Sequence, residues 1–461
     1  GERARAGPWA RVPQSLAGRM AATVLPPLAG PVECRHAPIG GGRGVFATAD
    51  IPAGTVVMAE EPLLRVSGAE VLSGETWHFA VARCLLQSER RAELLQRVGS
   101  LHPSGLGDLP QDVREQAMSL QAVAAAELAR AAMPPVTPVE ALLLLLKMQM
   151  NAFESGVYIE LAMVNHSCFP NCVKFGPGER QCGGGPISAQ GSSTWCPRSE
   201  IVAVQDIRAG QEVTISFLGS LERSAAARAA LFRRQHLVDL APPPPGGHPV
   251  AASAELEALL PGVEVGGARQ ILDELEAWLD KEDPDAVEVT AQAAAAAIEL
   301  LLVAEDRAAR LLHPRHLVLC RLRRRLSRAA RALLAARPDP AAAELLVRAA
   351  REVRLTQRLF LPATHLDAAE TAEDLAVGLA ALLTADRARL FTAFPADFGD
   401  FSAATRAEAE LRSEAVAVRQ LYSGKTQAAV AAASPAPSQP TPGCPPPPAA
   451  AGPGEDWSIF D

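Results

Sequence analysis

Residues 165–172 read NHSCFPNC and bring together two asparagines, a histidine and two cysteines. Side chains of these types can hold a metal ion, form hydrogen bonds in an active site or shape a turn. In the first case, Cys168 and Cys172 would join Cys182 and Cys196 in a four-thiolate zinc site. The gaps between these cysteines lack the paired short spacing of structural zinc modules, which disfavours a metal site. A turn and an active site both stay open at this point.

Two further blocks of sequence flank this motif. Residues 40–64 read GGGRGVFATADIPAGTVVMAEEPLL, and residues 200–218 read EIVAVQDIRAGQEVTISFL. Short apolar runs that are interrupted by glycine and proline predict small β-hairpins on both sides of the motif. In this order, the three blocks resemble the SET-domain protein lysine methyltransferases. Within that family, KMQMNAFESGVYIELAMVNHSCFPNC at residues 147–172 resembles the SMYD branch.

The resemblance implies an α+β fold. A SET domain of short β-strands and hairpins would be split by a helical insert and followed by an all-α, TPR-like helical C-terminal domain. Apolar periodicity independently predicts helices in the insert and over residues 254–421. The related strings LHPRHL at residues 312–317 and LPATHL at 361–366 each precede a long amphipathic segment, which is a faint sign of a helical repeat.

The expected domain boundaries follow from these patterns and from composition. Residues 1–19 hold four arginines and one acidic residue, so they are either a short transit peptide or extra sequence before a start at Met20. The end of the chain is rich in proline and alanine and cannot bury a core. We expect an N-terminal tail (1–29), a first SET part (30–67), a helical insert (68–145), a SET core (146–222), a degenerate post-SET region with a proline-rich linker (223–250), a helical TPR-like domain (251–424) and a disordered tail (425–461).

The cofactor that the resemblance implies is S-adenosyl-L-methionine. Backbone at the glycine loop would cradle its methionine part, because glycine allows close approach, although an ordinary hairpin turn explains the loop equally well. The histidine of the motif would lie at the cofactor without acting as a general base, and a buried structural histidine would occupy the same place. The residues at cofactor-binding positions are Gly41, Gly42, Arg43, Asn151, Asn165 and His166.

Three residues match the acceptor side of the site. Phe153 corresponds to a wall of the channel that desolvates the lysine amine. Tyr158 is expected near that channel or in the core. Phe217, the last residue of EVTISF, stands where the family has its catalytic tyrosine. Because a positioned polar group at a reacting centre is typically worth about 10²–10³ in rate, the missing hydroxyl puts activity in question.

The sequence also departs from the family where zinc is concerned. Residues 68–133 contain only Cys84, so the MYND zinc finger of the SMYD branch is missing. Residues 232–245 contain no cysteine, so Cys168 lacks the three partners that bind zinc in the family and we expect no metal. In the same region, Leu237 stands near the place of a stacking aromatic residue.

Two functions are therefore weighed. The first is S-adenosylmethionine-dependent transfer of methyl groups to lysine side chains of proteins, histone or non-histone. The alternative is a catalytically weak SET module that binds a protein partner through its helical repeats. The plastid SET enzymes with helical C-terminal domains fit less well, because Cys168 and Cys172 follow the SMYD pattern.

Composition limits the kinds of partner and the compartment that we expect. The formal net charge is −8, from 44 Lys plus Arg against 52 Asp plus Glu, so no overall basic field favours direct binding of nucleic acid. Eight scattered cysteines fit a reducing compartment. Apolar runs fall short of the roughly 18 residues needed to span a bilayer. We expect a monomer that acts on a lysine-bearing protein or peptide in the cytoplasm, the nucleus or both, with a plastid as the alternative.

Overall fold

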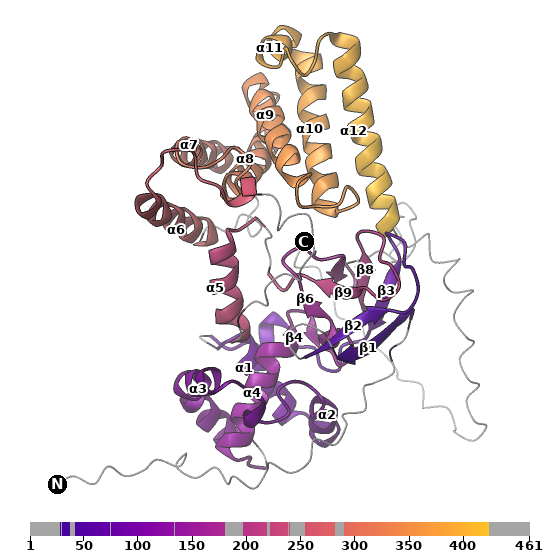
Figure 1. Ribbon diagram of the computed structural model, residues 1–461, viewed down its shortest axis with the longest axis vertical. Coiled ribbons are helices and arrows are strands. Elements are labelled where there is room, and N and C mark those ends of the chain that lie inside the picture. Colours follow the sequence, from indigo (N-terminus) through magenta and orange to yellow (C-terminus); the bar gives the residue numbers. More distant parts are fainter. Residues whose placement is uncertain are drawn as a thin grey trace, which may run out of the picture.

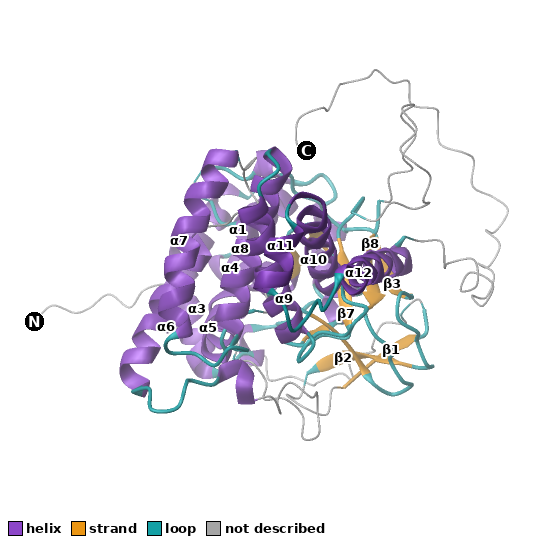
Figure 2. Ribbon diagram, turned by 90° about the horizontal axis from the view of Figure 1, so that it is seen from above, coloured by secondary structure: helices purple, strands orange, loops and turns teal. Residues whose placement is uncertain are grey.

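A computed structural model of the chain shows two parts, a strand-rich part with four helices beside it and a stack of long helices (Figure 1). Strands gather on one side of the molecule, and helices cover the other (Figure 2). The α+β class predicted from the sequence is confirmed. The structure describes residues 28, 30–36, 42–73, 75–132, 134–179, 197–218, 222–237, 239, 254–281 and 290–423.

The strands are short and form three small sheets. One sheet has the order β1-β2-β9-β6, the second β3-β8-β7, and β4 pairs with β5 alone. Glycine supports the turns between strands, since Gly54 and Gly210 have φ values of 83° and 84°, which favour glycine. The strands are β1 (Val32–His36), β2 (Arg43–Ala47), β3 (Val56–Glu60), β4 (Ala152–Phe153), β5 (Gly156–Val157), β6 (Asn165–His166), β7 (Cys172–Phe175), β8 (Ser199–Ala203) and β9 (Glu212–Ile215).

The pairing of β6 with β9 matters most for the motif. It is parallel, with Asn165 opposite Thr214 and His166 opposite Ile215. The amide N–H of Ser167 continues the ladder to the carbonyl of Ile215 at 2.9 Å. The start of NHSCFPNC is therefore a short, partly buried strand at the edge of this sheet and is not a turn.

Four helices follow β3, as the sequence predicts for the insert. Thr137 caps the last of them in a capping box with Glu140, and Pro138 occupies its first turn. The insert expected from the sequence is therefore mainly helical where it is described. The helices are α1 (Trp77–Gln87), α2 (Arg91–Val98), α3 (Gln111–Ala131) and α4 (Pro138–Asn151), with 3₁₀ turns at Gly68–Glu70 and Leu106–Asp108.

Helix α5 (Ala225–His236) lies in the segment that the sequence assigns to a degenerate post-SET region. Its alanines and arginines favour a helix, and Ser224 caps its start by accepting the N–H of Ala227 at 3.2 Å. Leu237 ends the helix with a φ of 59° and packs into the core instead of presenting a ring. The predicted proline-rich linker lies outside the described residues. Residues 180–196 lie outside them as well.

The remaining helices form the C-terminal stack (Figure 1). The two related strings each open one of its helices: His316 accepts the N–H of Val318, and His365 that of Asp367, both at 3.1 Å. Whether these repeats are TPR-like stays a prediction. The helices are α6 (Val265–Lys281), α7 (Ala291–Ala309), α8 (Leu317–Ala336), α9 (Pro340–Gln357), α10 (Leu366–Ala385), α11 (Arg387–Ala393) and α12 (Phe401–Tyr422), with a 3₁₀ turn at Ala254–Glu257 before them. A further 3₁₀ turn, Leu161–Met163, lies between β5 and β6 in the strand-rich part.

The strand-rich part and the helical stack share a core. Val202 and Val204 are fully buried in the same apolar cluster as residues of α9, α10 and α12, with Val173 and Phe175 packed against it. Buried Glu222 adds an ion pair to Arg324 of α8 at 3.4 Å. No helix of the described ranges is long and apolar enough to cross a membrane.

Candidate functional site

The side chain of Asn165 joins three segments of the SET region. Its Nδ2 atom donates to the carbonyl of Arg43 at 2.8 Å and to Oε1 of Glu212 at 2.7 Å. Both amide hydrogens are thus used inside the protein, which leaves the carbonyl oxygen of the amide as an acceptor. We call Arg43, Gly44, Asn165 and Glu212 the amide corner.

Two neighbouring glycines play different parts at the amide corner. A Cβ atom on Gly44 would lie 2.5 Å from Oε1 of Glu212 and 2.9 Å from Nδ2 of Asn165, so only glycine lets these groups close in. Gly42 is exposed, and a Cβ there would meet nothing within 4 Å. Backbone at Gly42 is therefore open to a ligand, whereas Gly44 is needed by the protein itself. Gly41 lies outside the described residues.

The loop after α2 connects Asn151 to the amide corner. The Asn151 amide donates to the carbonyls of His102 at 2.5 Å and Lys147 at 2.8 Å. The guanidinium of Arg43 donates to the carbonyl of Ser100, in the same loop, at 3.1 Å. Two of the six predicted cofactor residues are thus held by one loop that the sequence did not single out.

Lys147 anchors that loop from helix α4. Its ammonium donates to the carbonyls of Val98, Gly99 and Leu101 at 3.2, 2.9 and 2.7 Å. Burial lowers the pKa of Lys147 to about 8, because the charged ammonium is desolvated; Asp108 opposes this shift and Arg43 adds to it. The loop therefore has a fixed position beside the site.

Aromatic rings surround Phe217, which lies just after strand β9. The Phe217 ring lies 5.5 Å from the ring of His166, 6.2 Å from Phe232 and 5.1 Å from His236, between ring centroids. Phe153 meets it edge to face at 6.1 Å. We call these five residues the ring cluster. Phe232 and His236 come from α5, so this helix supplies the aromatic surface that Leu237 does not.

His166 is held on both of its nitrogens. Nδ1 accepts the N–H of Phe217 at 3.0 Å, and Nε2 lies 3.5 Å from Sγ of Cys168. Burial lowers the pKa of His166 to about 3, with smaller contributions from His236 and Arg228, so the imidazole is neutral at physiological pH. Its side chain is thus used within the protein, and a ligand would meet the backbone of His166.

Tyr158 is fully buried. Its hydroxyl bonds Oγ of Ser199 at 2.6 Å and Oγ of Ser155 at 3.0 Å, and its ring lies 5.8 Å from that of Phe153. Burial raises the pKa of the Tyr158 phenol. Tyr158 therefore supports Phe153 from the core. The ammonium of Lys174 lies over the Phe153 ring at 4.8 Å and donates to Ser155 at 2.8 Å, which fixes the same wall.

The described residues contain no group of three His, Cys, Asp or Glu side chains placed to hold a metal ion. Burial raises the pKa of Cys168, so this cysteine is a thiol beside His166. Cys172 lies in strand β7 and is fully buried. The other two cysteines of the four-thiolate alternative, Cys182 and Cys196, lie outside the described residues.

The predicted site residues therefore form a connected group. Arg43, Asn165, His166, Phe217 and Phe153 are linked by direct contacts in that order, through the β6–β9 pair and the ring contacts. The sequence missed Gly44, Glu212 and the α5 rings. Of these, only Phe232 and His236 could have been recognised from the local sequence, because a spacing of four residues places them on one face of a helix.

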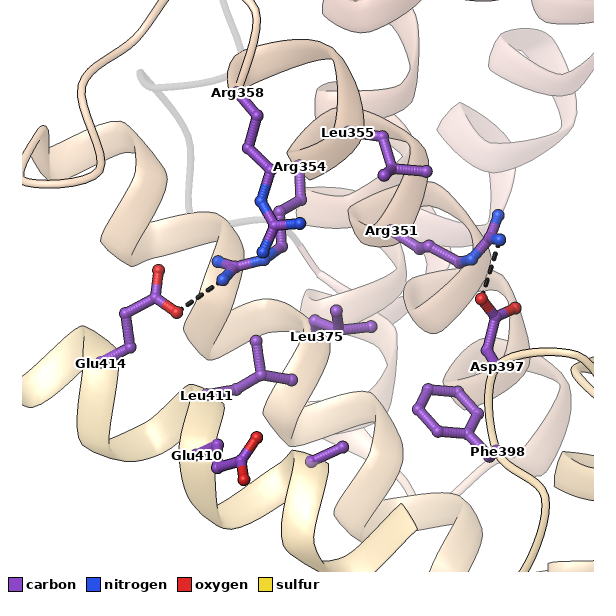
Figure 3. Close-up of a pocket in the computed structure, with 11 residues that line it drawn as sticks. Arg351, Arg354, Leu355, Arg358, Leu375, Asp397, Phe398, Glu410, Leu411 and Glu414 are labelled. Carbon is purple, nitrogen blue, oxygen red and sulfur yellow. Dashed lines mark hydrogen bonds and ion pairs between the residues drawn. The ribbon is translucent and has the colours of Figure 1, made fainter. Parts of the chain in front are cut away.

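A separate groove lies among the C-terminal helices and contains none of these residues. It has a volume of about 490 Å³ and lies between α9 and α12. Figure 3 shows its two ion pairs, Arg354 with Glu414 at 2.5 Å and Arg351 with Asp397 at 2.9 Å. Its charged groups are largely paired across the groove, so they stabilise the helix packing.

Comparison with known proteins places the site in a family context. Residues 42–218 match the family model of the SET domain. A search of curated proteins gives no match. One matching solved structure is described as the crystal structure of the SET domain of LSMT bound to lysine and AdoHcy; it is 12% identical, covers 87% of this chain and 92% of that chain, and has a TM-score of 0.29. So low a TM-score does not establish a shared overall arrangement. The family match thus covers strands β2 to β9 and helices α1 to α4.

Proposed function

We propose that this protein transfers methyl groups from S-adenosyl-L-methionine to lysine side chains of proteins. The observation that carries the proposal is the connected group from Arg43 to Phe153, which lies within the SET match. It places the amide corner and the ring cluster at the two residues of one short strand, β6. A charged cofactor and an apolar-stemmed amine need these two environments side by side.

The residues present fit the cofactor. Its amino acid part and its adenine carry hydrogen-bond donors, and the free carbonyl oxygen of Asn165 is an acceptor. Open backbone at Gly42 allows close approach of a ligand, and the backbone of His166 lies next in the strand. When bound, the cofactor supplies a methyl group on a positively charged sulfur.

The ring cluster fits the acceptor amine. A lysine amine has a reference pKa of about 10.4 and must lose a proton before it can attack. Phe153, Phe217 and Phe232 offer no hydrogen bonds and exclude water, so they lower that pKa by desolvation. Lys174 supports this wall, since its ammonium lies over the Phe153 ring and keeps the ring in place.

The finer assignment follows the resemblance. We propose a SMYD-like protein without the MYND finger, because helices α1 to α3 occupy the corresponding residues. The helical stack would form one wall of the substrate cleft, as TPR-like repeats, with the domain boundaries given above. A monomer in the cytoplasm or nucleus remains the expected state.

One observation favours a second function. Phe217 has no hydroxyl of its own, and the contacts of its ring with Phe153, His166, Phe232 and His236 bring none to it. A SET module of low activity that binds a protein partner through the helical stack would show the same feature. The two functions differ in turnover and share cofactor binding.

Calorimetric titration with S-adenosylmethionine, followed by methyl transfer from labelled cofactor to a cell lysate, tests both. We expect binding, and methylated lysines in the lysate by mass spectrometry. Binding without any methylated lysine would support the low-activity module. Absence of binding at millimolar cofactor would refute both forms of the proposal.

A further inference from the structure

His236 is the one residue of the ring cluster with an unused polar atom. Its Nδ1 atom is buried and has no hydrogen-bond partner among the described residues. His166, the other histidine of the cluster, uses Nδ1 for the N–H of Phe217 and places Nε2 beside Cys168. Buried polar atoms are nearly always paired in folded proteins, so an unpaired nitrogen at a site indicates a partner outside the chain.

The position of His236 is well defined. It lies in the last turn of α5, with its ring 5.1 Å from Phe217 and 4.8 Å from Phe232. The left-handed residue Leu237 closes the helix directly after it and donates its N–H to the carbonyl of Arg233 at 2.8 Å. Because Leu237 is buried in the SET core, the last turn of α5 cannot swing away without exposing it.

We infer that His236 is a catalytic residue: its Nδ1 atom accepts a hydrogen bond from the substrate amine and so provides the polar contact that Phe217 cannot make. This inference rests on the proposed methyl transfer. Burial lowers the pKa of His236 to about 4, so the ring is neutral and a nitrogen lone pair is available at physiological pH. A base this weak orients the amine and does not deprotonate it.

In this role His236 forms and breaks no covalent bond. The ammonium of the entering lysine loses one proton to water, and one of its remaining N–H groups points at Nδ1. The nitrogen lone pair then faces the methyl carbon, so that the new nitrogen–carbon bond forms as the carbon–sulfur bond breaks and S-adenosylhomocysteine is left. Orientation of this kind raises turnover and leaves the affinity for the cofactor unchanged.

A variant series separates this role from simple packing. His236→Phe keeps the ring and removes the nitrogens, and we expect turnover to fall about 10²-fold with unchanged cofactor affinity. Adding Phe217→Tyr to that variant should restore at least about tenfold, because a hydroxyl returns to the cluster. His78→Phe on α1 is the matched control and should change neither quantity. Full turnover in His236→Phe, or no gain in the double variant, would overturn the inference.

A second measurement does not depend on turnover. Nitrogen-15 spectra of the imidazoles are recorded with S-adenosylhomocysteine bound, before and after addition of Nα-acetyl-lysine methyl ester. We expect the Nδ1 signal of His236 to shift as it takes up the hydrogen bond, while the signals of His78 stay in place. An unchanged His236 signal at a saturating amine concentration refutes the inference even if the protein methylates lysine. A shift of the His236 signal in a protein without turnover would support the contact between His236 and the amine. It would count against the proposed methyl transfer.

Discussion

Asn165 and His166 are adjacent in strand β6, yet their side chains lie in opposite kinds of surroundings. At the amide corner, Asn165 meets a carbonyl and a carboxylate, and both of its N–H groups are satisfied. In the ring cluster, His166 lies among aromatic rings, and the only unpaired polar atom there belongs to His236.

This difference shows which chemistry the amide corner and the ring cluster can each support. Hydrogen bonds fix orientation, so the amide corner suits a ligand that must bind in one way. Rings exclude water and lower the pKa of an amine, so the ring cluster suits a group that must react. Hydrogen bonds hold the amide corner together, whereas packing of rings holds the ring cluster. A change in one of them should therefore leave the other intact. Four measurements test this separation.

The largest effect is expected for Asn165→Ala. The variant leaves the Arg43 carbonyl and the Glu212 carboxylate without a partner, each at a cost of about 1–3 kcal/mol. Cofactor affinity should fall about 10²–10³-fold, and methyl transfer with it. Titration calorimetry measures the affinity. Asn171→Ala, which removes a neighbouring amide that also bonds strand β9, is the control, and equal losses in both variants would contradict a special role of Asn165.

Phe217→Tyr changes the ring cluster alone. We expect turnover to rise at most about tenfold, because His236 already offers the amine a polar contact and the added hydroxyl brings a second one, while cofactor affinity stays the same. Rates on a lysine-containing protein library give the comparison. Phe401→Tyr, at an exposed site on α12, should have no effect. A rise of about 10²-fold or more would mean that no residue supplies this contact in the wild type, which would count against the role inferred for His236.

Gly44→Ala disturbs the amide corner through its packing. The added methyl group would press on Glu212 and Asn165, and we expect the free energy of unfolding to fall by about 1–3 kcal/mol. Chemical denaturation measures this loss. Gly42→Ala is the matched control, since its Cβ would meet nothing within 4 Å, so it should unfold normally and lose only cofactor affinity. Equal stability of the two variants would show that Glu212 moves aside freely.

The smallest effect concerns pH and the ring cluster. Burial lowers the pKa of His166 to about 3 and of His236 to about 4, whereas both titrate near 6.5 when unfolded. Between these values the unfolded chain binds more protons, so the free energy of unfolding should decrease as pH falls from about 6.5 towards 4. His236→Phe should flatten this dependence relative to wild type. If the free energy of unfolding depended on pH equally in wild type and His236→Phe, the pKa of His236 would be the same in the folded and the unfolded chain.

The sequence predicted the larger features well, for physical reasons. Hairpins are punctuated by glycine and proline, and Gly54 and Gly210 indeed have the backbone angles that such turns need. Helix starts carry caps, as at Thr137 and at His316 and His365. Patterns of this kind are local, so they can be recognised without knowing the fold.

The missed residues lie in contacts between distant segments. Glu212 reaches Asn165 across 47 positions, and Arg43 reaches Ser100 across 57. Nothing in the local sequence around Glu212 distinguishes it from any polar residue at the start of a strand. The resemblance indicates an aromatic residue near position 237, which is Leu237, whereas the structure supplies the aromatic surface from Phe232 and His236 of α5.

The parallel pairing of β6 with β9 also has a consequence for folding. His166 and Phe217 are 51 positions apart, and Asn165 and Arg43 are 122 apart, so neither end of the site can form from a local segment. Contacts of such separation require long loops to close, which makes them slow. The site should therefore be assembled late, after the hairpins and the α1–α4 helices have formed. A nascent or truncated chain that ends before β9 would have most of the core that the earlier strands share with α1–α4 but could bind neither cofactor nor amine.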